Sequence, residues 1–168
     1  MADVLVMLGS AKDQPHLERG LPYFERFNLS YDIKVSSAHR QPDQTAEIAG
    51  SAQAKGYRVI ICLAGMAAHL GGVVAAHTTL PVLGVPLGGS ALNGVDALYS
   101  FVQMPAGVPV ATVAVGGGRN AGLLAVQILA AGDPELHRRF RRFKRGLASA
   151  SRAKDRRLQD ALHRQPGN

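Results

Sequence analysis

Residues 31–55 read YDIKVSSAHRQPDQTAEIAGSAQAK, and this stretch decides the fold. Its first five residues form an alternating, largely apolar run, which predicts a strand. Residues 43–55 predict a helix, because Pro42 suits a first helical turn and Gly56 suits its end. Between them, residues 36–42 bring two hydroxyls, an imidazole and a guanidinium to the point where the strand passes into the helix. Ligands bind at that edge of an open parallel α/β sheet, so this loop is the first candidate site.

The order of strand followed by helix recurs along the chain. Residues 4–8 are a continuous apolar run, as in a strand buried on both faces, and three later runs also predict strands: residues 58–63, 81–86 and 108–115. The helices expected after them are a stripe through Leu17, Leu21, Phe24 and Phe27, weakened by Gly20 and Pro22, then residues 72–78, 96–104 and 121–131. This alternation predicts one α/β domain, a flavodoxin-like three-layer sandwich with five parallel strands in the order 2-1-3-4-5.

An extra helix is expected at the C-terminal end of the chain, starting near Pro134. Phe140, Phe143 and Leu147 give this helix one apolar stripe, so we expect it to pack on the domain or on a neighbouring subunit. Residues 1–150 are therefore expected to form a single catalytic α/β domain, followed by a basic polar tail over residues 151–168.

The positive charge of the chain is confined to this C-terminal region. Residues 133–168 hold 11 Lys and Arg against 4 Asp and Glu, whereas residues 1–132 hold 8 of each. A solvated helix face is the favoured interpretation, and an arm that binds a polyanion is the alternative. Residues 146–168 contain no aromatic side chain on which bases could stack, so no nucleic-acid partner is expected.

The chain carries features typical of a cytoplasmic protein. Its single cysteine, Cys62, cannot form an internal disulfide and lies in an apolar run, which predicts a buried, inert thiol in a reducing compartment. No signal peptide is visible, and no apolar run reaches the roughly 20 residues of a membrane span. We therefore expect a cytoplasmic location without membrane attachment.

Five loops follow the five predicted strands and meet at one edge of the sheet: residues 9–13, 36–42, 64–72, 87–93 and 116–120. All of them contain Gly, Ser, His, Arg or Asn. Glycine lets backbone N–H groups approach a ligand, and helix N-termini attract anions. Together they predict a site for a phosphorylated small molecule. Neither a Walker A motif nor Gly-x-Gly-x-x-Gly occurs, which disfavours a nucleoside triphosphate or a dinucleotide.

His39 is the best candidate for acid–base chemistry, because imidazole titrates near neutral pH and because Ser37 and Arg40 beside it can hold an anion. His69 is either a second site residue or a structural anchor of its loop. Asp13 either caps the first helix or accepts hydrogen bonds from ribose hydroxyls. No cluster has metal-ligand spacing, so no metal is expected. The remaining histidines are expected to be structural or surface residues: His16, His77, His137 and His163.

Several ordered motifs over about residues 4–135 are similar to one known family. They include Gly9-Ser10 with Asp13, Ser37-Ala38-His39-Arg40 with Pro42, Ala67-Ala68-His69-Leu70, residues 80–86, residues 98–110 and Asn120-Ala121. With these motifs the chain resembles the bacterial purine-pathway carboxymutases, the N5-carboxyaminoimidazole ribonucleotide mutases of the aminoimidazole ribonucleotide carboxylase family. The resemblance implies the flavodoxin-like fold, a homo-octamer with active sites near subunit contacts, and no cofactor or metal.

The resemblance also implies roles for individual residues. The reaction would move a carboxylate from the exocyclic nitrogen of the ribonucleotide to C4 of its imidazole, by decarboxylation, trapping of CO2 and recarboxylation. His39 would transfer the proton, and the other implied residues bind substrate. Ser10, Ser37 and Arg40 would hold the phosphate, Asp13 the ribose, and the loop with Gly65, Met66, Ala67, His69 and Leu70 would close on the imidazole and the carboxylate or CO2.

Three departures from the family pattern stand in this chain. Lys12 replaces a usual Ser, Met66 and Gly71 replace a usual Gly and Pro, and the turn at residues 116–120 is about two residues short. The alternatives to the mutase are a direct carboxylase of aminoimidazole ribonucleotide that uses CO2 and a non-catalytic ribonucleotide-binding protein. Arg40 and residues 67–70 favour the mutase.

Overall fold

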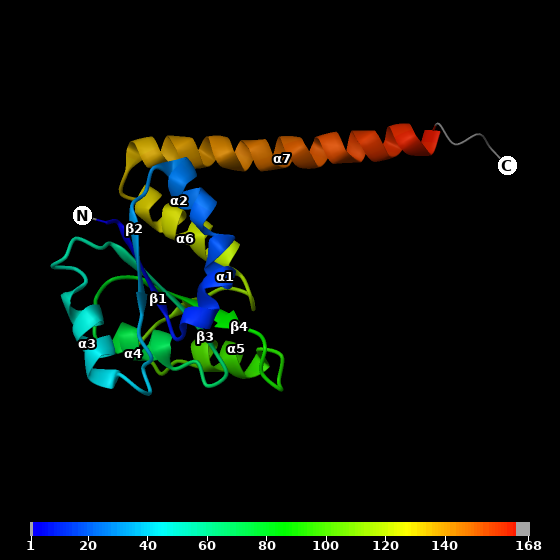
Figure 1. The fold of residues 1–168 in the computed structure, drawn as a ribbon. Coiled ribbons are helices and arrows are strands. Elements are labelled where there is room, and N and C mark those ends of the chain that lie inside the picture. Colours follow the sequence, from blue (N-terminus) through cyan, green and yellow to red (C-terminus); the bar gives the residue numbers. More distant parts are fainter. Residues whose placement is uncertain (1, 164–168) are drawn as a thin grey trace.

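Five parallel strands form one sheet in the order β2-β1-β3-β4-β5 (Figure 1). The structure is a computed structural model that describes residues 2–163. Its strands are β1 (Val4–Leu8), β2 (Tyr31–Val35), β3 (Val59–Gly65), β4 (Val82–Leu87) and β5 (Ala111–Thr112). The predicted fold and strand order are therefore confirmed.

Helices cover both faces of this sheet, because alternate side chains of the strands point to opposite sides. Val6, Ile61 and Val85 belong to one apolar core, and Met7 and Cys62 belong to the other. The first core is closed by α1 (Gln14–Glu18), α2 (Leu21–Phe27), α6 (Gly118–Ala130) and α7 (Pro134–His163), and the second by α3 (Pro42–Ser51), α4 (Leu70–Ala76) and α5 (Val95–Val102). Cys62 is fully buried, and burial raises the pKa of its thiol, which confirms the predicted buried cysteine.

The predicted first helix is two helices, α1 and α2, separated at Gly20. A Cβ on Gly20 would lie 2.6 Å from the carbonyl oxygen of Gly118, so the backbone of this junction packs directly on the start of α6. Because a side chain would be excluded there, the break lets α6 approach closely. The third predicted helix also differs, since α4 begins at Leu70 rather than at Gly72.

The strand β5 is much shorter than the predicted residues 108–115. It pairs with β4 only through Leu83 with Ala111 and Gly84 with Thr112. The next residue of β4 facing this ladder is Pro86, which has no N–H group to donate. The chain still follows β4, because Val113 donates a backbone hydrogen bond to Gly84 and Gly116 donates one to Pro86. Regular pairing therefore ends at Thr112, because Pro86 cannot donate the next hydrogen bond of the ladder.

The last helix, α7, begins on the domain and then leaves it as a projecting arm (Figure 1). Asp133 caps its start by accepting hydrogen bonds from the N–H groups of Glu135 and Leu136. Phe140 and Phe143 are buried against the α2 residue Phe27, as predicted, whereas Leu147 is 51% exposed and does not pack on this chain.

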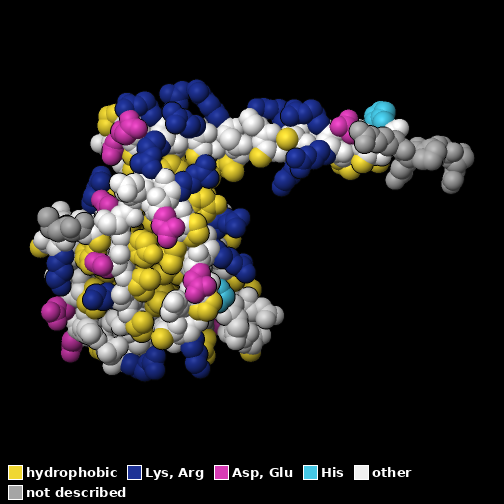
Figure 2. All heavy atoms as spheres, turned by 45° about the horizontal axis from the view of Figure 1, so that its top comes forward, with side chains coloured by type: hydrophobic (Ala, Val, Ile, Leu, Met, Phe, Trp, Pro, Cys, Tyr) yellow, Lys and Arg dark blue, Asp and Glu magenta, His cyan; other side chains and the backbone are white. Residues whose placement is uncertain are grey.

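The proposed tail continues α7 as far as His163, and its residues 164–168 lie outside the described part of the chain. Figure 2 shows Lys and Arg side chains along this arm. Within residues 2–163, no helix combines the length and apolarity needed to cross a membrane.

Candidate active site

A cleft of about 770 Å³ lies at the carboxyl edge of the sheet, where the loops after β1, β2, β3 and β4 meet. All ten residues that the sequence and the family resemblance predict for the site line this cleft. Their positions therefore agree with the prediction, while their individual roles stay predictions. They are Ser10, Asp13, Ser37, His39, Arg40, Gly65, Met66, Ala67, His69 and Leu70.

The turn after β2 places Ser37 and Arg40 side by side. Arg40 and Gln41 donate backbone hydrogen bonds to the carbonyl oxygen of Ser37, at 3.1 and 2.7 Å. The Nε of Arg40 then donates to Ser37 Oγ at 3.2 Å. A hydroxyl and a guanidinium held together in this way can donate several hydrogen bonds to one phosphate.

The neighbouring Ser36 has a structural role. It is fully buried, and its Oγ shares a hydrogen bond of 2.8 Å with Oγ1 of Thr45 in α3. The Thr45 hydroxyl also bonds the carbonyl oxygen of Gln41. This buried pair fixes the loop to the helix that follows it, so that the next residues are presented to the cleft.

The turn after β1 is a reciprocal cap of the short 3-10 helix η1 (Ala11–Asp13). The N–H group of Ser10 donates to Asp13 Oδ2 at 2.9 Å, and the N–H group of Lys12 donates to Ser10 Oγ at 3.4 Å. Asp13 therefore helps to cap η1, whereas the predicted cap of the first helix is not formed, because its side chain makes no cap hydrogen bond to α1. Burial raises the pKa of its carboxyl group, and the Ser10 hydrogen bond and the nearby His16 oppose that shift.

His39 and His69 are in direct contact although they are 30 residues apart. The Nε2 of His39 lies 2.7 Å from Nδ1 of His69, and the rings meet edge to face with centroids 4.7 Å apart. His39 comes from the turn after β2, and His69 is the N-terminal cap residue of α4 after β3. The strands β2 and β3 flank β1, so their loops converge above its end.

Met66 adopts a backbone conformation that favours glycine, with φ of 57°. This geometry gives a physical reason for the glycine that the family pattern has at this position. Met66 is 68% exposed and lines the cleft, and Leu70 at the start of α4 is buried. The loop therefore has one exposed apolar end and one anchored end.

One residue of the cleft lies outside the loops that the sequence predicted for the site. His16 lines it, although it was expected to be a surface residue. Its position three residues after Asp13, in the first turn of α1, is the signal that could have found it. Two of the predicted loops contribute further lining residues, as expected: Lys12 after β1, and Leu87, Gly88, Gly89 and Ser90 at the end of β4 and in the loop after it.

The turn at residues 116–120 does not line the cleft, in contrast to the expectation that all five loops would share the site. Its Gly118 packs on the backbone of His16, where an added Cβ would overlap the carbonyl oxygen. Gly118 therefore brings α6 close to α1. Its function is packing, which the sequence pattern does not distinguish from ligand approach.

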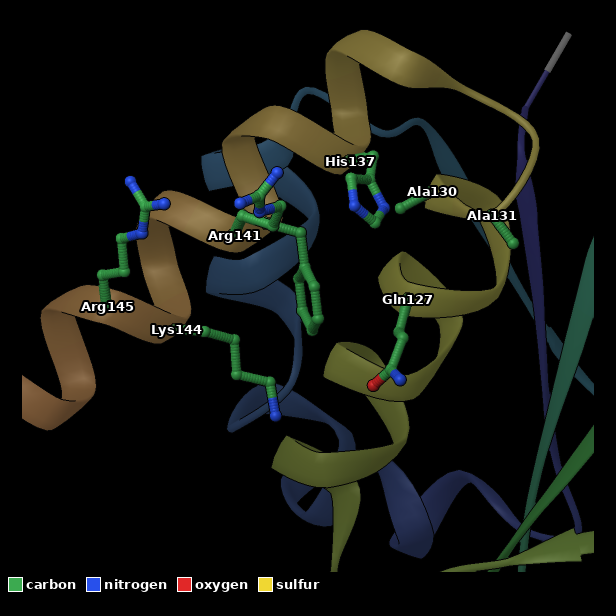
Figure 3. Close-up of a pocket in the computed structure, with 8 residues that line it drawn as sticks. Gln127, Ala130, Ala131, His137, Arg141, Lys144 and Arg145 are labelled. Carbon is green, nitrogen blue, oxygen red and sulfur yellow. The ribbon is translucent and has the colours of Figure 1, made fainter.

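A second hollow, of about 510 Å³, lies between α6 and α7 (Figure 3). It is lined by Gln127, Ala130, Ala131, His137, Phe140, Arg141, Lys144 and Arg145. Because α6 runs back from the carboxyl edge of the sheet, its last residues place this hollow at the opposite edge from the cleft. In residues 2–163 no group of three or more His, Cys, Asp or Glu side chains is arranged to hold a metal ion.

Comparisons with known proteins agree with this geometry. The family model described as AIR carboxylase matches residues 3–150. N5-carboxyaminoimidazole ribonucleotide mutase from Haemophilus influenzae is 50% identical over 145 residues, which cover 85% of this chain and 88% of that protein. The protein of the same name from Escherichia coli K12 is 51% identical over 141 residues, with 83% of each chain covered.

The crystal structure of Treponema denticola PurE is similar in fold, with a TM-score of 0.84 and 26% identity over 92% of this chain and 97% of that chain. The structure of a substituted PurE2 from the same organism gives a TM-score of 0.85 and 25% identity over 94% of this chain and 99% of that chain. The family model spans most of the described residues. The two mutases share about half of their aligned residues with this chain, which is enough to show common family membership. This chain therefore belongs to the AIR carboxylase family.

Proposed function

We propose that this chain converts N5-carboxyaminoimidazole ribonucleotide to 4-carboxy-5-aminoimidazole ribonucleotide, a step of de novo purine biosynthesis. The observation that carries the proposal is the cleft, in which acid–base and anion-binding side chains converge in a chain about half identical to relatives named for this mutase. The substrate is phosphorylated and does not cross membranes freely, so we place the reaction in the cytoplasm.

The phosphate is held by Ser10, Ser37 and Arg40. The Arg40–Ser37 hydrogen bond already sets their spacing, and charge-assisted hydrogen bonds to phosphate are among the stronger polar contacts in proteins. Lys12, in the same turn as Ser10, adds a second positive charge to this end of the cleft. Asp13 accepts hydrogen bonds from the ribose while one of its oxygens continues to cap η1.

His39 transfers the proton. Loss of CO2 breaks the bond between the exocyclic nitrogen and the carboxyl carbon, and the electron pair stays on the nitrogen, which takes a proton. C4 then forms a bond to the trapped CO2, and the proton on C4 leaves to a base while its bonding electrons return to the ring. One imidazole gives a proton in the first step and regains it in the second, so the reaction needs no net proton.

The loop from Gly65 to Leu70 closes on the imidazole and keeps CO2 in the cleft. Gly65 and Ala67 leave room for the backbone to approach the ring, and the exposed Met66 side chain lies at the cleft wall, where it can exclude water. Closure of a loop anchored at one end by the buried Leu70 requires movement of only a few residues.

The chain works as a homo-octamer. Val95, Tyr99 and Val102 form an exposed apolar stripe on α5, and Leu147, Leu158 and Leu162 are exposed on α7. Exposed apolar stripes on two helices are typical of surfaces that are covered by another protein molecule. Light scattering should therefore give a mass close to eight times the chain mass of 17.7 kDa.

Initial rates with two substrates test this function. The mutase predicts rapid turnover of N5-carboxyaminoimidazole ribonucleotide at low bicarbonate and little carboxylation of aminoimidazole ribonucleotide at high bicarbonate. Efficient turnover of aminoimidazole ribonucleotide with bicarbonate, and none of the N-carboxylated substrate, would identify a direct carboxylase instead. Binding of both ribonucleotides without turnover of either would identify a non-catalytic binding protein.

A further inference from the structure

The hollow between α6 and α7 carries a cluster of basic side chains that the proposed reaction does not use. Arg141 follows His137 by four residues, and Lys144 and Arg145 follow Arg141 by three and four. Residues at these spacings share one face of a helix, and all four line the hollow. None of the described residues that line it is acidic. Positive charge is therefore concentrated at the edge of the sheet opposite the cleft.

The three cations of this cluster have no acidic partner on the described part of the chain. No ion pair within residues 2–163 involves Arg141, Lys144 or Arg145. By contrast, Arg139 of the same helix donates a hydrogen bond of 2.7 Å to the carbonyl oxygen of Arg26 in α2. Like charges three and four residues apart destabilise a helix. An anion bound among these side chains would remove that repulsion.

The end of α6 offers a competing explanation for the cluster, because cations are favourable near the carbonyl end of a helix. The last carbonyl groups of α6 are already bonded, however. Those of Ile128, Leu129 and Ala130 accept hydrogen bonds from the N–H groups of Ala131, Gly132 and Asp133, respectively. The end of α6 therefore does not require the cations of α7 as hydrogen-bond partners.

The wall of the hollow is partly apolar, which suits a ligand with a flat organic body. Ala130 and Phe140 line it, and both are largely buried. The Nζ of Lys144 lies 5.6 Å from the centre of the Phe140 ring, so this cation extends along the apolar wall. Gln127 lies opposite on α6, and its amide can both donate and accept hydrogen bonds (Figure 3). The volume of about 510 Å³ is within the range of roughly 300–1,000 Å³ typical of small-molecule sites.

We propose that this hollow binds a nucleoside monophosphate. Arg141 and Lys144 hold the phosphate, because a guanidinium and an ammonium group together supply several charge-assisted hydrogen bonds to its oxygens. The base lies against Ala130 and Phe140, and the Gln127 amide bonds its polar edge. This site is separate from the cleft, so the proposal does not depend on the reaction proposed there.

Calorimetric titration of AMP into the full chain tests this site. Arg40→Gln is the reference protein, because it weakens the phosphate contacts of the cleft. We expect the reference to bind one AMP per chain saturably, and to bind adenosine and inorganic phosphate about 10-fold more weakly or worse, since each supplies half of the ligand. Adding Arg141→Gln and Lys144→Gln should raise the Kd of AMP by about 10-fold or more. Adding Arg152→Gln and Lys154→Gln, which remove the same charge from the projecting part of α7, should change it by less than about twofold at physiological salt.

Four results would overturn the proposal. The first is an absence of saturable AMP binding to the reference protein. The second is equal weakening by the two pairs of substitutions, which would show general attraction to a basic helix. The third is phosphate binding as tight as AMP binding, which would show a charge cluster without a site for the base. The fourth is AMP binding in the wild type that disappears in Arg40→Gln, which would place the nucleotide in the cleft. The substituted side chains of α7 are exposed, so their replacement should leave the fold intact.

Discussion

At the scale of single residues, glycines decide how closely the elements around the cleft can pack. The ring of Phe101, which is fully buried, lies against both Gly71 in α4 and Gly84 in β4. A Cβ on either glycine would overlap this ring. Gly71 stands where the family pattern has Pro. Because the ring of Phe101 occupies the space that a Cβ would need, this chain requires glycine at this position.

Gly71→Ala should therefore destabilise the chain by about 2 kcal/mol, because a buried ring cannot move aside without strain. Its neighbour provides a matched control. A Cβ on Gly72 would meet only the flexible end of Met104, at 3.0 Å, and alanine is the better helix former, so Gly72→Ala should be neutral or stabilising. Denaturant unfolding of both variants checks the difference, and equal stabilities would contradict it.

Asp13→Asn should raise KM roughly tenfold without destabilising the chain. Burial raises the pKa of the Asp13 carboxyl, so the folded state binds this proton more tightly than the unfolded chain does. Ionised Asp13 therefore lowers the free energy of unfolding, and this loss develops as pH rises through the range in which carboxyl groups titrate. Asparagine removes that charge and still accepts the hydrogen bond from Ser10, but it weakens contacts to ribose hydroxyls. Unfolding at pH 7 and steady-state kinetics measure the two effects; a large loss of stability would contradict the cap geometry.

At the scale of elements, the edge strand β2 is the least buried part of the sheet, with four of its five residues exposed. It is joined to the loop before β3 by a hydrogen bond of 2.6 Å from the Tyr57 hydroxyl to Asp32 Oδ2. This hydrogen bond is the main cause that raises the pKa of Tyr57 to about 12, with burial and the Asp32 charge adding to it. The contact stabilises β2 and, through it, the position of the turn that carries Ser37 and His39.

Tyr57→Phe should lower the free energy of unfolding by about 1 kcal/mol at pH 8. Because the pKa of Tyr57 is higher in the folded state than its ordinary value of 10.0, this contribution is complete below pH 10 and is lost as pH rises through about 12. The difference between wild type and variant should therefore vanish near pH 12. A difference that stays constant with pH would contradict the assignment.

Much of this architecture could be predicted from the sequence, for physical reasons that differ between elements. The strands β1, β3 and β4 are buried on both faces and are therefore continuous apolar runs. The loops after these three strands and after β2 carry the polar residues of the site. The contact between His39 and His69 could not be predicted, because it depends on the three-dimensional convergence of two loops. The predicted length of β5 was wrong. Its β-branched residues favour a strand, but regular pairing with β4 ends at Thr112 because Pro86 has no N–H group to donate to the ladder.

At the scale of the whole molecule, α7 joins two surfaces with different roles. Phe140 and Phe143 form ring contacts with Phe27, and Phe143 also contacts Tyr23, so the first half of α7 belongs to the core of the domain. The second half projects from the domain and carries Leu158 and Leu162, exposed beside many Lys and Arg side chains (Figure 2). The first half stabilises the fold, and the second half is available for contact with another subunit.

Two truncations separate these roles. A chain ending at Gly132 loses Phe140 and Phe143 and should aggregate or unfold, because it exposes the apolar side chains of α2. A chain ending at Gly146 keeps both phenylalanines, so it should remain folded but form smaller oligomers. Circular dichroism and light scattering measure fold and mass. A folded chain ending at Gly132 with an unchanged oligomer would contradict both assignments.

The most direct test of the proposed mutase reaction follows the carboxylate itself. N5-carboxyaminoimidazole ribonucleotide labelled with carbon-13 in its carboxylate is supplied in excess unlabelled bicarbonate, and the product of the first turnovers is examined by mass spectrometry. We expect the label to be retained at C4, because CO2 stays in the cleft between the two steps that His39 serves. A product whose carboxylate comes from the unlabelled bicarbonate would contradict this reaction.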